Sequence, residues 1–294
     1  MRGLVIINGY PNAEKFMRQG LRICTALCAE GIETDLMKNG EVYACVQSDG
    51  RVESSLADKY DFAVYLDKDK YLGRMLECAG LRLFNSAKAV EVCDDKLCTY
   101  LALQTGSVRL VKSIPAPLCY TKGAIPNPIF LRSVAEQLGF PMVAKKSFGS
   151  FGSGVKLVHG MEELKLAEEE FLHEPHFYQE FIQQSRGRDY RIIVIGGKAV
   201  GCMARVAVQG EFRSNIELGG RGEKANPPKE YWSAAEQAAL ALGLDYCGVD
   251  LLETQEGPIL CEVNSNAFFD GFEQVTGLDV AALYAKHIAK TMNK

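Results

Sequence analysis

The sequence has no excess of positive charge and no long apolar run. Its 33 Lys and Arg residues are outnumbered by 37 Asp and Glu residues. The resulting net charge of -4 argues against a nucleic acid as the obligatory partner, because binding to phosphates requires a cationic surface. Apolar stretches such as residues 4–7 are far shorter than the roughly 20 residues that cross a bilayer, and too short for a secretory signal. We therefore expect a cytoplasmic protein that binds neither nucleic acid nor membrane.

Close cysteine pairs are also missing. The ten cysteines include no CxxC pair that would indicate zinc or redox chemistry, so we expect reduced thiols. Cys24 and Cys28 lie one helical turn apart, a spacing that suits either a metal site or a helix face packed with small residues. His173 and His176 flank a Glu-Pro pair with no third ligand nearby, and both are expected to lie in a loop.

Two common glycine motifs for nucleotide binding are absent. No GxGxxG follows the first expected strand, so the dinucleotide fingerprint is missing. GxxxxGK(S/T) does not occur either, which excludes a P-loop. A nucleotide site in this chain would need a different phosphate-binding loop.

What the sequence does contain is an alternation of strand-like and helix-like segments. Hydrophobic residues make up 47% of the 294 residues, and at about 150 residues per domain the length predicts two domains with sizeable cores. In the first 85 residues the alternation predicts a parallel sheet covered by helices. The expected strands are 5–7, 33–37 and 62–66, and the expected helices are 71–80 and 14–30, the latter with Phe16, Leu21, Ile23 and Leu27 at helical spacing.

A proline-rich connector, with four of the ten prolines in residues 113–128, divides the rest of the chain. One helix, 87–104, is expected before it. A small α+β unit is expected after it, with helices 128–138 and 161–173 and strands 141–146 and 154–158. The remaining segments are expected to form strands 179–182, 191–195, 199–207, 248–254 and 257–264, followed by a terminal helix at 279–292.

A glycine-rich loop joins two of these strands. The segment KKSFGSFGSGV, residues 145–155, places Gly149, Gly152 and Gly154 among serines. Glycine lets backbone amides approach phosphate oxygens without a Cβ in the way, so the loop could bind an anion. A plain hairpin loop explains the same pattern.

Three oxygen-bearing side chains lie in two neighbouring apolar strands. Asp250 belongs to GVDLLET, and Glu262 and Asn264 belong to CEVNSN. A spacing of two puts Glu262 and Asn264 on one face, and antiparallel pairing would bring Asp250 close to them. Two carboxylates and an amide suit magnesium, although a solvent-facing polar side of the sheet remains the alternative.

Six segments in this order resemble the ATP-grasp superfamily, specifically its RimK-like branch, over residues 96–277. They are DDKLCTYLAL, PMVAKKSFGSFGSGV, YQEFIQQSRGRDYR, FRSNIELGG, GVDLLE and CEVNSNAFFDGFEQVTGLD. The resemblance implies an ATP-grasp fold of mixed α/β and α+β class, with an N-terminal Rossmann-like pre-ATP-grasp domain. The implied divisions are a pre-ATP-grasp domain (1–86), a linker helix and connector start (87–112), a small lobe with a glycine-rich lid (113–180) and a large lobe with the metal site (181–294).

The resemblance also implies an activity. Members of this branch join a carboxylate to an amine through an acylphosphate, giving ADP and phosphate, with ATP and Mg²⁺ as cofactors and Mn²⁺ as a possible substitute. The expected partners are small-molecule or peptide substrates, and a homo-oligomer is possible. Two other interpretations stay open: an ATP-grasp phosphotransferase acting on a hydroxyl, and a non-catalytic ATP-binding module.

Positions that match the family's motifs are expected to form the nucleotide site. Lys96 and Lys145 would contact phosphates and base, although ordinary surface charges would equally explain these lysines. The loop residues that would cover the phosphates are Gly149, Ser150 and Gly152. Glu180 and Phe181 would bind adenine and Asp189 would bind ribose, although a turn would equally explain the Gly-Arg-Asp segment at 187–189. The residues that would lie near the triphosphate are Arg213, Ser214 and Asn215, and those that would bind magnesium are Asp250, Glu262 and Asn264.

Arg205 is the expected catalytic residue. It is the charged residue in the apolar strand GCMARVAV, where the resemblance implies an arginine that binds the transferring phosphate and the developing oxyanion. An unpaired buried guanidinium would be costly, and a bound anion would offset that cost. A salt bridge to a carboxylate of a neighbouring strand is the alternative, and Arg191 is a second candidate for the oxyanion role.

The sequence departs from the family after the EVN motif. Many relatives have a small residue, Ser and Pro there, followed by Gly, whereas this chain continues with two phenylalanines, Phe268 and Phe269. Because this stretch borders the acceptor site in the family, both phenylalanines are expected to reshape that site.

Overall fold

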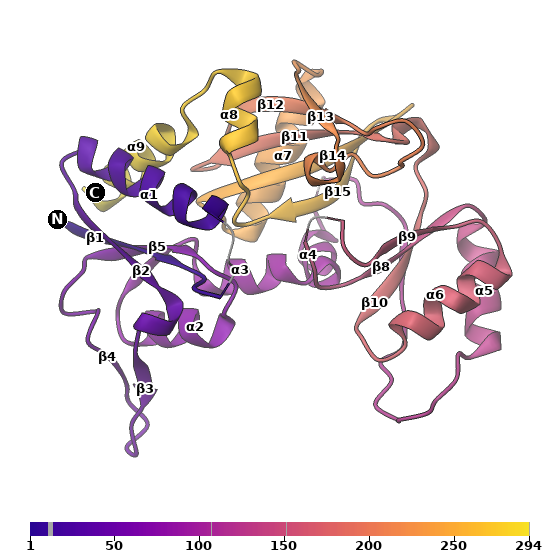
Figure 1. Cartoon of the computed structure of the whole chain (residues 1–294), viewed down its shortest axis with the longest axis horizontal. Coiled ribbons are helices and arrows are strands. Elements are labelled where there is room, and N and C mark those ends of the chain that lie inside the picture. Colours follow the sequence, from indigo (N-terminus) through magenta and orange to yellow (C-terminus); the bar gives the residue numbers. More distant parts are fainter. Residues whose placement is uncertain (11–13, 107, 151, 294) are drawn as a thin grey trace.

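The computed structural model describes residues 1–10, 14–106, 108–150 and 152–293. Its three larger sheets follow one another along the chain (Figure 1). The first is parallel, with strand order β2-β1-β5-β6, as the alternation in the sequence predicts. The strands are β1 (Arg2–Ile7), β2 (Glu33–Lys38), β5 (Phe62–Leu66) and β6 (Arg82–Phe84), and the helices are α1 (Glu14–Ala29) and α2 (Lys70–Cys78).

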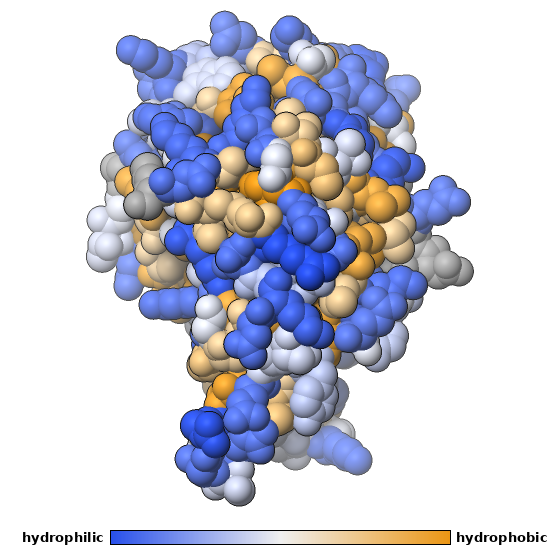
Figure 2. Space-filling view, turned by 90° about the vertical axis from the view of Figure 1, so that its left-hand side faces the viewer, coloured by the Kyte–Doolittle hydropathy of each residue, from blue (hydrophilic) through white to orange (hydrophobic). Residues whose placement is uncertain are grey.

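A small hairpin, β3 (Ala44–Val46) paired with β4 (Val52–Ser54), projects from the first sheet. It forms the lower tip of the molecule in Figure 1, and Figure 2 shows this tip covered mostly by hydrophilic residues. Neither the hairpin nor β6 was predicted, because strands of three residues are too short to reveal an alternating pattern.

Helix α1 buries a different face from the one expected. Ile23 and Leu27 are buried, but Leu21 is 51% exposed. Positions two residues apart point in nearly opposite directions on a helix, so Leu21 and Ile23 cannot share a face. The buried face is completed by Gln19 and Gly20.

The segment expected as one helix at 87–104 is two helices, α3 (Ala87–Asp94) and α4 (Lys96–Leu103). Asp95 separates them with an extended backbone, φ -96° and ψ 111°. Its carboxylate accepts hydrogen bonds from the main-chain nitrogens of Leu97 and Cys98, so it caps α4. This cap places Lys96 at the first position of a helix.

The second sheet is antiparallel, with strand order β7-β10-β8-β9. Helices α5 and α6 pack on it around a core of its own. One prediction is wrong here: His176 is not in a loop but begins β10, where it is buried and contacts the Glu168 carboxylate at 2.8 Å. The elements are β7 (Ser113–Pro115), α5 (Pro128–Leu138), β8 (Met142–Lys146), β9 (Val155–Val158), α6 (Met161–Phe171) and β10 (His176–Glu180).

The third sheet is antiparallel, with strand order β13-β12-β11-β14-β15. Helix α7 packs on one face, and α8 and α9 lie toward the other (Figure 1). The sequence did not predict α7, α8 or β13. The elements are β11 (Arg188–Ile195), β12 (Lys198–Val206), β13 (Arg221–Lys224), α7 (Lys229–Leu242), β14 (Tyr246–Thr254), β15 (Gly257–Asn264), α8 (Asp270–Thr276) and α9 (Val280–Met292), with short 3-10 turns at Asn39–Glu41, Gln183–Ser185 and Ile216–Leu218.

The first and third sheets are joined by a shared core. Val5, Phe62 and Phe84 of the first sheet belong to one apolar cluster with Ile193 of β11 and with α9. Asn85, 1% exposed, stabilises the same junction through hydrogen bonds. Its side chain donates to the carbonyls of Tyr246 and Ser265, both at 2.8 Å, and accepts from the Tyr246 nitrogen at 2.9 Å.

All ten cysteines are free thiols. Cys24 is partly buried and Cys28 is exposed, and no cluster of His, Cys, Asp and Glu that could hold a metal by itself occurs among the described residues. Within the same residues, no helix is long and apolar enough to cross a membrane.

Candidate functional site

A cleft of about 480 Å³ is lined by residues of all three sheets, a size typical of small-molecule sites. Every residue that the sequence predicts for the nucleotide and metal sites lines this cleft, and so does Arg205, although the roles of the individual residues stay predictions. Residue 151 of the glycine-rich loop lies outside the described residues.

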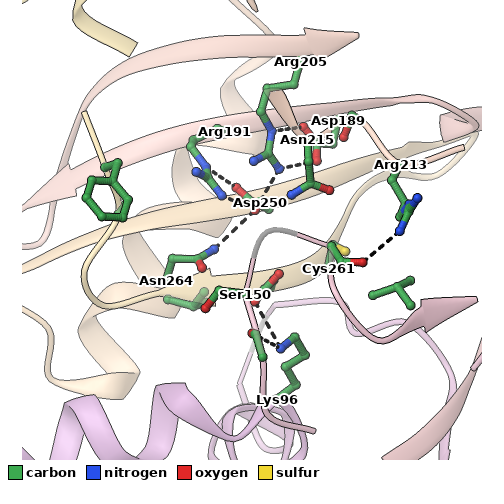
Figure 3. A pocket seen from close by; sticks show the side chains of 18 of the residues that line it. Lys96, Ser150, Asp189, Arg191, Arg205, Arg213, Asn215, Asp250, Cys261 and Asn264 are labelled. Carbon is green, nitrogen blue, oxygen red and sulfur yellow. Dashed lines mark hydrogen bonds and ion pairs between the residues drawn. The ribbon is translucent and has the colours of Figure 1, made fainter. Parts of the chain in front are cut away.

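Lys96 connects the glycine-rich loop to the third sheet. Its main-chain nitrogen donates to the carbonyl of Ser147 at 3.1 Å, and its ammonium donates to the carbonyl of Gly149 at 2.9 Å. The same ammonium lies 3.5 Å from a carboxylate oxygen of Glu262. Figure 3 shows the side chain pointing to the loop that bears Ser150. Lys96 is therefore not a free surface charge.

Lys145 on β8 is 5% exposed. Its ammonium lies 5.1 Å from the centre of the Phe177 ring, and among the described residues it has neither a hydrogen-bond partner nor a carboxylate partner. The ammonium itself keeps some contact with solvent and is therefore open to a ligand in the cleft. Because Lys145 lines the cleft, an anion bound there would supply the missing charge.

The glycine-rich loop reaches across the cleft to the segment containing Arg213. The Arg213 guanidinium donates to the carbonyl of Gly152 at 2.9 Å. A Cβ at Gly152 would lie 3.2 Å from the Asn215 side-chain oxygen, and the residue has a φ of +74°. Glycine is thus required both for this backbone conformation and for the close approach. Arg213 is itself held by Glu211, and that hydrogen-bonded pairing lowers the pKa of Glu211 to about 2.

Asp250, Glu262 and Asn264 lie together, as the strand spacing predicts. Asp250 pairs directly with Glu262 in the β14–β15 ladder, and the Asn264 amide is 3.3 Å from Asp250 Oδ2. A bulge in this ladder leaves Cys261 unpaired, so Cys261 and Glu262 both line the cleft. All three predicted side chains therefore lie together in the cleft.

Asp250 is also the centre of a buried ion-pair network (Figure 3). Arg191 donates to both of its oxygens at 2.8 and 2.7 Å, and Arg205 lies 2.8 Å from Oδ2. Burial opposes ionisation of Asp250, but the two arginines outweigh it and hold the pKa of this carboxyl below its ordinary value. Asp250 is therefore a carboxylate in the folded protein.

The expectation that the buried guanidinium of Arg205 lacks a carboxylate partner is wrong. Arg205 is 4% exposed and binds Asp189 through two hydrogen bonds, one of them 2.7 Å long, in addition to its contact with Asp250. The salt bridge that was the alternative interpretation is present. Because Arg205 also lines the cleft, a second role toward a bound anion remains compatible with this geometry.

The segment between the second and third sheets contributes Glu180 and Phe181. Glu180 ends β10, and the Phe181 ring meets the Phe212 ring edge-on at 6.3 Å. Both residues line the same cleft as Lys145, and the resemblance places adenine at this segment.

Cys261 is not equipped to act as a nucleophile. Burial raises the pKa of its thiol to about 11, even though the charge of Lys145 opposes the change. The thiolate is the reactive form, and it is scarce at neutral pH for such a group.

The two phenylalanines after β15 have different positions. Phe268 lines the cleft, and its ring meets the Phe16 ring edge-on at 5.0 Å. Phe269 is 1% exposed and belongs to the shared core, so it does not border the cleft as expected. The sequence also gave no indication of Lys68, which lines the cleft from the first sheet.

Comparisons with known proteins agree with this architecture. A family model described as the RimK-like ATP-grasp domain matches residues 127–288. β-Citrylglutamate synthase B of Danio rerio is 34% identical over 227 residues, 76% of this chain and 55% of that protein. A probable α-L-glutamate ligase of Marinomonas sp. (strain MWYL1) is 33% identical over 221 residues, 74% of this chain and 70% of that protein.

A solved structure gives the same result for the fold. D-alanine–D-alanine ligase from Bacillus anthracis complexed with ATP matches with a TM-score of 0.74 at 19% identity, covering 100% of this chain and 97% of that one. The predicted ATP-grasp fold is thereby confirmed. The chain spans only 55–58% of the length of the β-citrylglutamate synthases that it matches.

Proposed function

Because the chain belongs to the RimK-like ATP-grasp family, we propose that it is an ATP-dependent carboxylate–amine ligase that releases ADP and phosphate. The observation that supports this most directly is Lys145, which is 5% exposed and whose ammonium lacks a counter-ion among the described residues. The triphosphate of ATP would supply that charge. Lys96 and the glycine-rich loop lie beside the same cleft, as a phosphate site requires.

In the proposed reaction a carboxylate oxygen of the acid substrate attacks the γ-phosphorus of ATP. The bond to the bridging oxygen breaks, so ADP leaves and an acylphosphate forms. The amine nitrogen then attacks the acyl carbon, loses a proton and displaces phosphate. In this scheme Lys96 and Lys145 hold the phosphates, the glycine-rich loop excludes water, and the Arg205 guanidinium stabilises the anionic states. No protein nucleophile takes part.

The donors around Asp250 lie next to Lys96 of the proposed phosphate site, since Glu262 is 3.5 Å from its ammonium, and they fit magnesium. Glu262 and Asn264 offer oxygens. Asp250 offers Oδ1, which accepts from Arg191 Nε at 2.8 Å, whereas its Oδ2 contacts both arginines and Asn264. Magnesium prefers oxygen ligands and completes its shell with phosphates and water. When bound, the ion would neutralise charge on the transferring phosphoryl group, and Mn²⁺ accepts the same donors.

The names of the relatives suggest which substrates to test first. One is a synthase of β-citrylglutamate and another is a probable α-L-glutamate ligase. We therefore propose L-glutamate as the amine and a polycarboxylate such as citrate as the acid. ADP formation that requires both compounds, together with an amide detected by mass spectrometry, would support the ligase. ADP formed with a hydroxyl compound and no amine would instead indicate a phosphotransferase, and ATP binding without any turnover would indicate a non-catalytic module.

Lys145→Met is expected to weaken ATP binding about 10–100-fold, the usual effect of losing one charge-assisted contact. Isothermal titration with ATP and magnesium measures this directly. Lys156→Met is the matched control, because Lys156 lies on the neighbouring strand β9, pairs with Glu170 and does not line the cleft. Equal affinities for the Lys145 variant and the wild type would remove the main support for the phosphate site.

ATP is expected to slow hydrogen exchange in the glycine-rich loop. Ser147 is already buried, and its nitrogen donates to the carbonyl of Pro175, so the change should be confined to residues 148–154. Glycine and serine bury little apolar surface, and nucleotide contacts would therefore dominate the protection of these amides. Exchange measured with and without an ATP analogue tests this, with a peptide from α6 as the internal control. Unchanged exchange in 148–154 would contradict a lid.

A cytoplasmic location, the domain boundaries at residues 86, 112 and 180, and any homo-oligomer stay predictions.

A further inference from the structure

Lys68 lies at the junction of the first sheet, the glycine-rich loop and the cleft. It follows β5, and its ammonium is 2.7 Å from a carboxylate oxygen of Asp94. The same ammonium is 3.4 Å from the Ser150 hydroxyl in the glycine-rich loop. All three residues line the cleft. A cation from the N-terminal part of the chain therefore reaches the loop that covers the proposed phosphate site.

The backbone at Lys68 is fixed by several hydrogen bonds. The buried Asp67 carboxylate accepts from the side chains of Asn8 and Asn39 at 2.9 and 2.7 Å, and from the Lys68 nitrogen at 2.7 Å. The carbonyl of Asp67 accepts from the side chain of Asn266 at 3.1 Å. Because Asn266 is two residues beyond Asn264, Lys68 is held close to the end of β15 that bears the proposed magnesium ligands.

We propose that Lys68 binds the carboxylate of the acid substrate and holds it next to the γ-phosphate, exchanging Asp94 for the substrate. This inference rests on the proposed ligase function. Its physical basis is that a carboxylate must approach a triphosphate of the same charge, which requires a cation between them. The ammonium of Lys68 contacts the glycine-rich loop, and the backbone next to Lys68 is tied through Asn266 to the segment that follows β15, so the side chain is placed to act where the two reactants would meet.

The ion pair of Lys68 also suits an exchange of partners. Its side chain is 42% exposed and that of Asp94 is 25% exposed. Solvated pairs of this kind contribute little to stability, so replacing one carboxylate with another costs little. Arg205 differs in this respect, because it is buried between Asp189 and Asp250 and cannot leave them without exposing two charges to an apolar interior.

The test compares Lys68→Met with Lys68→Arg and with the control Lys70→Met. Lys70 begins α2, is exposed and does not line the cleft. With citrate and L-glutamate as the probes, Lys68→Met should raise the KM for citrate about 10–100-fold, the usual effect of removing a charged hydrogen-bond partner. The KM for ATP should change less than about threefold. Lys68→Arg should restore part of the affinity for citrate, and Lys70→Met should behave as wild type.

An unchanged KM for citrate in an active Lys68→Met variant would overturn the assignment and leave the ligase function intact. Equal losses for citrate and ATP, or a lower melting temperature without an effect on KM, would make Lys68 a structural residue and would also overturn it. Wild-type protein that forms no ADP in response to citrate or to other carboxylic acids would overturn the ligase function, and with it the role of Lys68.

Discussion

Glu262→Gln is expected to abolish turnover while leaving the fold intact. Glutamine keeps the shape of the side chain but removes the charge that faces Lys96 at 3.5 Å and would bind the metal. A metal ion contributes several kcal/mol to stabilising the transition state, and each 1.36 kcal/mol is a factor of ten in rate, so kcat should fall about 1,000-fold or more. The fold should persist because Glu262 is only partly buried and its backbone pairing with Asp250 does not depend on the side chain.

ADP release at saturating magnesium and ATP measures the effect of Glu262→Gln, and circular dichroism checks the fold. Glu256→Gln is the matched control, since Glu256 lies in the turn of the same β14–β15 hairpin and contacts Arg109 at the surface. Near-normal magnesium-dependent turnover of a folded Glu262→Gln variant would exclude Glu262 as a metal ligand.

Arg205→Ala is expected to lower kcat about 100–1,000-fold, the usual loss for one preorganised donor, with a much smaller change in ATP affinity. Negative charge accumulates on the transferring phosphate and then on the tetrahedral oxygen, so the guanidinium should matter most in the transition state. The structure adds a second expectation. Among the described residues, the variant leaves the buried Asp189 without an ion-pair partner and Asp250 with Arg191 alone, and breaking such a network costs about 3–5 kcal/mol of unfolding free energy.

A double variant separates the two effects of Arg205. Arg205→Ala combined with Asp189→Asn removes one charge of each sign, so it should recover much of the stability lost in Arg205→Ala. Turnover should stay low, because the donor that faces the cleft is still missing. Urea denaturation and kcat, measured on the same preparations, give both quantities. Recovery of kcat together with stability would assign Arg205 to structure alone and leave the oxyanion role to Arg191 or Arg213.

The sequence predicted the cleft better than it predicted the contacts within it. The glycine-rich loop and the Asp250, Glu262 and Asn264 pattern could be found because each is local or depends on strand periodicity. The partners of Arg205 could not be found in this way. They depend on the register that sets Asp189 opposite Arg205 and Asp250 opposite Arg191. A slip of one residue would move every such side chain to the other face, and no local pattern fixes that register.

Two other omissions have similar physical causes. Lys68 reaches Asp94 and Ser150, which are distant in sequence, and an ion pair of this kind has no sequence signature. Helix α7 was not predicted because its buried face consists largely of alanines, such as Ala235 and Ala238. Alanine is only weakly hydrophobic, so the buried face of this helix differs little from its exposed face in the hydrophobic pattern of the sequence.

The core shared by the first sheet and α9 determines the order in which the chain can complete its folding. Val5, Phe62 and Phe84 are synthesised well before Tyr284 and Ile288 of the same cluster. Until these two residues emerge from the ribosome, the first sheet has only the apolar cover that α1 supplies through Ile23 and Leu27, and the rest of this face stays open to solvent and to chaperones. The first sheet therefore completes its packing only after the third sheet and α9 have been made.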